Sequence, residues 1–149
     1  MGAAIVPYQM FRASDGPLVA GTPNERIWIR FVEALNRKDW FDDPRFADNK
    51  ARCANREYVL AQIQETIGGM TRADCLDLLA RYDVPSGPIL TVSEANESGR
   101  MKMIEVDHPA AGPIRVPNNP IEGFGPARNQ HAPSLGEHTQ KVLAELGLA

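Results

Sequence analysis

Cysteines and histidines are the residues of this sequence that could act as nucleophiles or bind a metal ion. Cys53 and Cys75 belong to no Cys-x-x-Cys pair, and two cysteines cannot build a disulfide framework. A catalytic thiol would need a histidine nearby, and the sequence places none close to either cysteine. The histidines are scattered without the spacing of zinc ligands, at His108, His131 and His138. We therefore expect two reduced, partly buried thiols, no metal site and no thiol catalysis.

Neighbouring carboxylates are the next candidates for acid and base chemistry. Asp42 and Asp43 stand beside Arg45, and such a pair could supply a general acid and a general base. Short-range capping and ion pairing with the arginine explain the same cluster without a substrate. We favour this structural interpretation.

Glu137 and His138 form a second possible acid–base pair. Adjacent residues of a helix point about 100° apart, so their side chains would not face each other. Glu137 in the first turn of a helix is favoured by the helix dipole, which is sufficient to explain it. We therefore assign no catalytic role to this pair.

A last group would gather Tyr8, Arg12, Asp15 and His108 between two predicted hairpins. This group would make the chain a small enzyme with its own site. We keep it as an alternative hypothesis, to be tested by charge-to-alanine changes that abolish a measured activity without unfolding the protein.

The elements that must position these residues begin with a β-hairpin over residues 7–21. Asp15 and Gly16 supply its turn, because both residue types tolerate positive φ. A helix follows, with Thr22 or Asn24 as the N-cap. Its apolar residues recur with helical spacing, and they include aromatic side chains that we expect in the core. That helix stops near Asn36, and the aromatic residues are Trp28 and Phe31.

Helices also dominate the middle of the chain. Residues 37–50 are irregular, with two short helical turns around Pro44. One helix is expected over 49–68, ended by a pair of glycines. The next begins with a capping pattern at Thr71 and stops before Pro85. Residues 84–89 form a rigid loop with two prolines.

The C-terminal part combines a short helix, a strand pair, a Pro/Gly-rich stretch and a final helix. Strands in hairpins, rather than in alternation with helices, indicate an α+β fold and not a doubly wound parallel sheet. No Gly-rich dinucleotide fingerprint or P-loop is present in the sequence. The predicted ranges are a helix beginning at 91–95, strands at 101–106 and 114–116, the Pro/Gly-rich stretch at 117–134, and a helix after Leu135.

The composition of the chain argues against some classes of binding partner. The formal net charge of −3 argues against nucleic acid, because neutralising phosphates requires a basic face. No apolar run approaches the roughly 20 residues of a membrane span, and the first residues lack the features of a signal peptide. We expect a cytoplasmic protein with neither nucleic acid nor membrane as its partner.

Several short motifs follow one another along nearly the whole chain, each of them weak by itself. They are Pro7-Tyr8-Gln9-x-Phe11, Asp15-Gly16, Asp43-Pro44-Arg45-Phe46, Asn49-x-x-Arg52-x-x-Asn55-Arg56, Val84-Pro85-x-Gly87-Pro88, His108-Pro109-x-x-Gly112 and Ala132-Pro133-x-Leu135-Gly136-Glu137-His138-Thr139. Their order and spacing resemble the C-terminal portion of family III CoA-transferases. That family includes formyl-CoA transferase, carnitine CoA-transferase and the alpha-methylacyl-CoA racemases.

The resemblance implies a part of a CoA-handling enzyme and not a complete catalyst. In the family, a large domain carries the CoA pocket and an aspartate nucleophile, and no part of this chain matches that nucleophile. Residues 1–116 would be the small, lid-side domain, and 117–149 the segment that returns to the large domain. Gly2, Tyr8 and Gln9 would lie beside the lid and contact the cofactor, while no residue here would be catalytic.

The resemblance also implies partners. The coenzyme A thioester would be bound by the full-length enzyme and not by this chain alone. The chain would contact the large domain of the same enzyme or a second chain, within a homodimer. Two alternatives stay open: a free-standing, non-catalytic interaction module derived from that domain, and a part of an acyl-CoA racemase.

Overall fold

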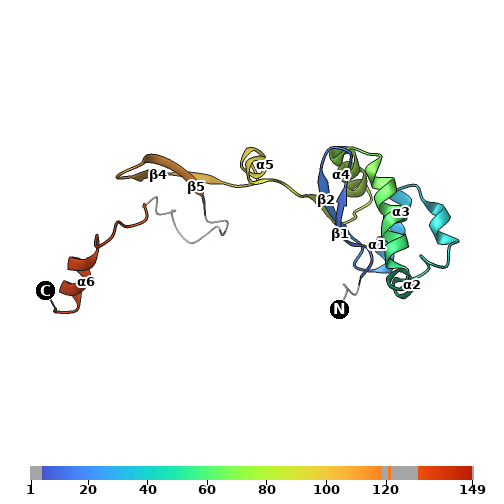
Figure 1. The fold of residues 1–149 in the computed structure, drawn as a ribbon, viewed down its shortest axis with the longest axis horizontal. Coiled ribbons are helices and arrows are strands. Elements are labelled where there is room, and N and C mark those ends of the chain that lie inside the picture. Colours follow the sequence, from blue (N-terminus) through green and yellow to red (C-terminus); the bar gives the residue numbers. More distant parts are fainter. Residues whose placement is uncertain (1–4, 119–120, 122–130, 149) are drawn as a thin grey trace. The chain divides into compact units, whose positions relative to one another are not determined.

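The computed structural model describes residues 5–118, 121 and 131–148, which have an α+β fold as predicted. By their internal contacts they belong to two units, residues 1–90 and 91–149, each described below by itself (Figure 1). The division expected between residues 116 and 117 refers to the parts of a longer enzyme, and it stays a prediction. The first of the two compact units ends at Leu90.

The first unit contains a three-stranded antiparallel sheet with the order β1-β2-β3. Strands β1 (Tyr8–Arg12) and β2 (Pro17–Gly21) form the predicted hairpin. Strand β3 (Ser86–Pro88) pairs with β2, with Val19 opposite Gly87. The sequence predicted only a loop at this place. A three-residue segment with a proline has no periodicity of its own, so only its pairing with β2 defines it as a strand.

The first helix of this unit begins at a polar cap. Helix α1 (Glu25–Ala34) is capped by Asn24, whose side chain accepts a hydrogen bond from the Ile27 amide at 3.0 Å. Thr22, the other predicted cap, is buried before the helix and does not cap it, so that alternative was wrong. Asn36 has a φ of 54° just beyond the helix, as its predicted role as a stop requires.

The single helix predicted over residues 49–68 is two helices. Helix α2 (Asn49–Ala54) is separated from α3 (Arg56–Gly68) by Asn55, whose backbone is not helical. The Asn55 side-chain amide donates to the Ala51 carbonyl at 2.9 Å. A side-chain bond of this kind competes with the helical pattern, which explains the interruption.

The remaining helices of the unit follow the predicted order. A short 3-10 helix, η1 (Lys38–Phe41), lies in the irregular segment. Helix α4 (Arg72–Arg81) begins at Thr71, whose hydroxyl accepts from the Asp74 amide at 3.1 Å, as predicted. Helices α1, α3 and α4 lie together on one side of the sheet (Figure 1). Their apolar side chains and those of the strands form one core that includes Phe11, Leu18, Trp28, Phe31, Val59, Ile63, Ile67 and Leu79.

The second unit consists of short elements. Helix α5 (Val92–Glu97) has a complete capping box between Thr91 and Glu94. Strands β4 (Met103–His108) and β5 (Gly112–Pro117) form the predicted second hairpin. Helix α6 (Thr139–Glu145) follows residues 119–120 and 122–130, which lie outside the described part of the chain. Among the described helices, none combines the length and apolar character needed to cross a bilayer.

Candidate functional site

The segment that leads into the sheet is held by a group of polar side chains from α2. The Val6 amide donates to the Asn49 side-chain oxygen at 3.0 Å. The Val6 carbonyl accepts from Arg52 Nε at 2.8 Å. Asn49 and Arg52 are three residues apart and therefore share one face of the helix. Both backbone groups of Val6 are thus fixed by α2, and Val6 is fully buried. We call Asn49, Arg52 and Glu25 the Val6 clamp.

Arg52 is the centre of this clamp. Its side chain is 1% exposed. Its guanidinium donates to the Phe46 carbonyl at 3.1 Å and to the Glu25 carboxylate at 2.7 Å, and it lies 4.3 Å from the centroid of the Trp28 ring. Glu25 also accepts a bond from the Asn49 amide at 3.0 Å, so it joins α1 to α2. A buried arginine requires partners of this kind, because removing an unpaired charge from water has a large free-energy cost.

Three aromatic rings, those of Trp28, Trp40 and Phe46, pack against one another beside the Val6 clamp. Trp40 and Phe46 stack with their centroids 4.9 Å apart and an angle of 4° between the rings. Trp28 lies nearly parallel to both, with centroids 6.0 Å away. All three side chains are buried, and Trp28 is a core residue as predicted. The aromatic stack therefore fixes the position of Phe46, whose carbonyl binds Arg52.

The residues expected to contact a cofactor are not gathered in one place. Gly2 lies outside the described residues. Tyr8 and Gln9 are successive residues of β1, so their side chains point to opposite faces of the sheet. The Tyr8 ring is exposed and lies over Gly21, where an added Cβ would overlap it. Gln9 points toward α3 and accepts from Arg56 at 3.2 Å. Their contact with a cofactor stays a prediction, and of these two side chains only that of Tyr8 is largely exposed.

Of the two carboxylates beside Arg45, that of Asp43 has a structural partner, as the favoured interpretation expected. Asp43 accepts three bonds from the Arg45 side chain, the shortest at 2.7 Å, and one from its backbone amide. These bonds lower the pKa of Asp43 below its usual value. A carboxyl group that is ionised well below neutral pH is a poor general acid at neutral pH.

The group proposed from Tyr8, Arg12, Asp15 and His108 does not form within either unit. Asp15 accepts a hydrogen bond from the Arg72 amide and so joins the hairpin turn to α4. His108 belongs to the second unit, where its Nδ1 accepts from the amides of Ala110 and Ala111 at 3.2 Å. The His108 ring therefore closes the turn between β4 and β5.

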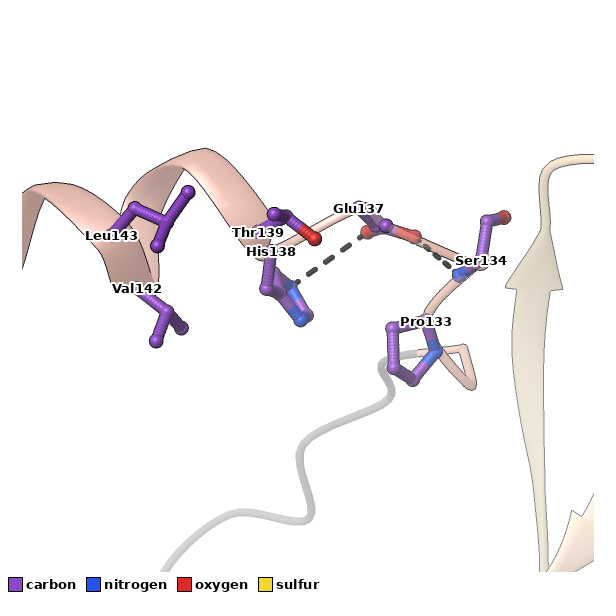
Figure 2. Close-up of a pocket in the computed structure, with 8 residues that line it drawn as sticks. Pro133, Ser134, Glu137, His138, Thr139, Val142 and Leu143 are labelled. Carbon is purple, nitrogen blue, oxygen red and sulfur yellow. Dashed lines mark hydrogen bonds and ion pairs between the residues drawn. The ribbon is translucent and has the colours of Figure 1, made fainter. Parts of the chain in front are cut away.

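Glu137 and His138 are close to each other, contrary to the expectation from the sequence. His138 Nε2 lies 3.9 Å from the Glu137 carboxylate, because both residues precede α6 and do not follow helical geometry. The same carboxylate accepts from the Ser134 amide at 2.7 Å (Figure 2). These residues and Leu143 line a shallow, open hollow of about 410 Å³. Glu137 therefore stabilises the turn that precedes α6 through its bond to Ser134. It does not lie in the first turn of the helix, as the sequence analysis expected.

Neither cysteine lies in an arrangement suited to catalysis. Cys75 is fully buried in the core and Cys53 is half-buried. Burial raises the pKa of Cys75 to about 11. A thiol that stays protonated at neutral pH is a weak nucleophile. Among the described residues, no group of three or more His, Cys, Asp or Glu side chains could hold a metal ion.

The raised pKa of Cys75 leads to a testable result. We expect the free energy of unfolding to fall as the pH rises from about 9 to about 11, because the unfolded chain loses the thiol proton in this range while the folded chain retains it. The Cys75→Ala variant should lack this part of the pH dependence. Urea unfolding at pH 8 and pH 10.5 measures the difference, and an equal slope in both proteins would contradict the assignment.

The Val6 clamp was not recognised from the sequence. Asn49 and Arg52 were noticed only as parts of a motif, and arginine is a residue type normally expected at the surface. The available signal was their spacing of three on a helix, together with a carboxylate at the start of the preceding helix.

Comparison with known proteins identifies the family. The model of CoA-transferase family III matches residues 2–139. The formyl-CoA:oxalate CoA-transferase of Rhodopseudomonas palustris strain BisA53 is 31% identical over 125 residues, which cover 80% of this chain and 29% of that protein. The succinyl-CoA:glutarate CoA-transferase of Mus musculus is 30% identical over 149 residues, covering 96% of this chain and 34% of that protein.

A solved structure agrees with this assignment. A CAIB/BAIF family protein from Brucella suis matches 97% of this chain with a TM-score of 0.72 and 29% identity, and the match covers 39% of that protein. The chain therefore spans about a third of the length of the relatives it matches. The family match extends over most of the chain, as the motifs predicted. This chain belongs to CoA-transferase family III.

Proposed function

We propose that this chain is the small-domain part of an acyl-CoA:carboxylate CoA-transferase, which closes the active site and supports a homodimer without being catalytic alone. The nucleophile that forms the acyl intermediate would come from the large domain. The proposal assigns a cytoplasmic location to the enzyme. It is supported by the family, and by relatives whose names pair an acyl-CoA with a carboxylate acceptor.

The observation that carries this proposal is that the buried polar groups of the first unit bind the backbone of the unit itself. Arg52 and Asn49 bind the backbone of Val6, next to the residues that the resemblance places beside the lid. The charge of Arg52 is matched by Glu25, so it is not left over for a substrate. A scaffold that holds one backbone segment rigidly suits a positioning role, because catalytic groups must be held within fractions of an ångström.

The coenzyme A thioester would be bound mainly outside this chain. Tyr8 and Gln9 point to opposite faces of β1, and Gln9 is already bound to Arg56. These two side chains do not form a complete cofactor site by themselves. Tyr8, with its exposed ring, is the described residue that we propose for contact with the cofactor near the lid.

The test is a CoA-transfer assay on the isolated chain. Formyl-CoA with oxalate and succinyl-CoA with glutarate are the substrate pairs to use, with the Rhodopseudomonas palustris relative as the positive control for the first pair and the mouse relative for the second. We expect no transfer above the uncatalysed rate, because the nucleophile is supplied by another domain. Transfer by the isolated chain would contradict the proposal.

A free-standing interaction module is the second candidate, favoured by the continuous core of the first unit. Such a module would self-associate or bind a ligand without any large domain. Light scattering separates the two: a strictly monomeric chain that does not change on addition of acyl-CoA argues against the module.

A further inference from the structure

Gly21 lies opposite Tyr8 in the first hairpin, and the Tyr8 ring rests on it. The register of β1 and β2 pairs these two residues directly. The Thr22 amide donates to the Pro7 carbonyl at 3.0 Å, on one side of the pair. Tyr8 and Gly21 therefore form a pair that exchanges no backbone hydrogen bonds, in which Cα atoms are about 4.5 Å apart and side chains come closest. This pairing explains why the ring extends over the neighbouring strand.

The space under the ring exists only because residue 21 is a glycine. A Cβ atom at Gly21 would overlap Cδ2 of the Tyr8 ring and would lie 2.9 Å from Cε2, closer than real Cβ atoms come. Gly21 is buried, whereas Val19, on the same face of β2, is 38% exposed. The burial of Gly21 agrees with a ring that covers it. We call the backbone surface of Gly21 under the Tyr8 ring the Gly21 seat.

The backbone at the Gly21 seat is held from two sides. The Gly21 amide donates to the Pro85 carbonyl at 3.1 Å, and the next amide, that of Thr22, binds Pro7. Thr22 and Pro7 are both buried. These bonds oppose a shift of the strand, whereas the Tyr8 side chain can rotate about χ1. Gly21→Ala would therefore displace the ring and not the strand.

Gly87 provides a comparison within the same sheet. It belongs to β3 and pairs with Val19 of β2. A Cβ atom at Gly87 would meet no atom within 4 Å, so no side chain requires a glycine there. A strand glycine often marks a place where another group approaches closely, and this holds for Gly21 but not for Gly87.

We propose that Gly21 is a positioning residue, whose missing side chain fixes the orientation of the Tyr8 ring for contact with the coenzyme A thioester. This inference rests on the proposed function, in which Tyr8 contacts the cofactor. The Val6 clamp holds the backbone two residues before Tyr8, and the Gly21 seat holds the ring from one side. The ring is still 60% exposed, which leaves room for a ligand. A ring that is already oriented loses little conformational freedom on binding.

The first measurement examines the ring in the free chain by NMR. The unmodified chain should show nuclear Overhauser contacts between the Tyr8 ring protons and the α-protons of Gly21, because the ring lies on the seat. Gly21→Ala should abolish the contacts between the ring and the α-proton of residue 21. Gly87→Ala is the matched control and should retain the contacts with Gly21. A ring that keeps its place in Gly21→Ala would overturn the proposal.

The second measurement examines the cofactor in a chimera, in which this chain replaces the matching portion of the mouse relative. That match covers 96% of this chain, and succinyl-CoA with glutarate is the substrate pair. Gly21→Ala should raise the KM for succinyl-CoA by about 10-fold and change kcat by less than about 2-fold, because Tyr8 would contact the bound cofactor and not the nucleophile. Gly87→Ala should leave both constants unchanged.

A Tyr8→Ala background separates positioning from a purely structural role. Once the ring is removed, Gly21→Ala should cause no further increase in KM, because there is no ring left to displace. A role of Gly21 in the strand alone would add the same effect in both backgrounds. Equal effects of Gly21→Ala with and without the ring would overturn the proposal.

The remaining outcomes also decide. An unchanged KM in Gly21→Ala would overturn the proposal if Tyr8→Ala raises KM in the same chimera. Tyr8→Ala without any effect on KM would overturn it as well, through the cofactor contact, whereas the assay of the isolated chain tests the proposed function separately. In a chimera that folds without activity, calorimetric binding of succinyl-CoA replaces KM, with the same expected ratio. If the chimera does not fold, the ring contacts in the free chain decide.

Discussion

Replacing Arg52 by alanine is expected to lower the free energy of unfolding of the first unit by about 3–5 kcal/mol. Two buried backbone carbonyls, those of Val6 and Phe46, would lose their donor, and a void would open beside the Trp28 ring. The lost ion pair contributes less, because Glu25 is half exposed and can be solvated by water. Arg52→Lys should recover little of the loss, since an ammonium group cannot reproduce the planar set of donors.

Urea unfolding followed by tryptophan fluorescence measures this effect. Both tryptophans of the chain, Trp28 and Trp40, lie in the first unit and report on it alone. Arg45→Ala is the matched control, because Arg45 also pairs with a carboxylate at 2.7 Å and lies 3.6 Å from the centroid of the Tyr58 ring, but at the surface. Its unfolding midpoint should stay close to that of the unmodified chain. Similar losses in both variants would show that burial of Arg52 is not the cause.

Replacing Phe46 by alanine is the second large effect that we expect, with a loss of about 3–5 kcal/mol. Phe46 is 1% exposed and stacks on Trp40, so its removal leaves a cavity between large rings that cannot close around it. Its carbonyl also binds Arg52, and a shift of the backbone there would loosen the Val6 clamp. The fluorescence of Trp40 should change together with the stability.

Phe41→Ala is the control for this change. Phe41 has the same side chain and lies five residues away, but it is 45% exposed. Its replacement should cost less than about 1 kcal/mol, because little apolar surface is buried there. The comparison is made by urea unfolding of both variants under the same conditions. Equal losses would contradict the stack as the source of the stability.

These results connect stability with the proposed function. The clamp and the stack lie next to Val6, two residues before the exposed ring of Tyr8. A variant that loosens Val6 would therefore also release the start of the sheet. In the full enzyme, such a change is expected to affect the position of the segment beside the lid, not the chemistry of the nucleophile.

The turns and caps of this chain could be predicted because they depend on a few neighbouring residues. Asp15-Gly16 gave the hairpin turn, and Thr71 and Thr91 gave the starts of two helices. A capping side chain reaches an amide two or three positions away, so the sequence contains both partners of the bond. The α+β class followed from the order of these elements, and the family from the order of the motifs.

The candidate site depended on contacts between distant parts of the chain. Arg52 is buried because it meets Val6, 46 residues earlier, and Glu25 of another helix. Strand β3 exists only through its pairing with β2. Hydrophobic periodicity and capping patterns contain no information about such distant partners, because the burial of a charge depends on what surrounds it in space. The sequence alone determined the hairpin turn, most helix caps and the family, and the tertiary structure decided which polar residues became part of the core.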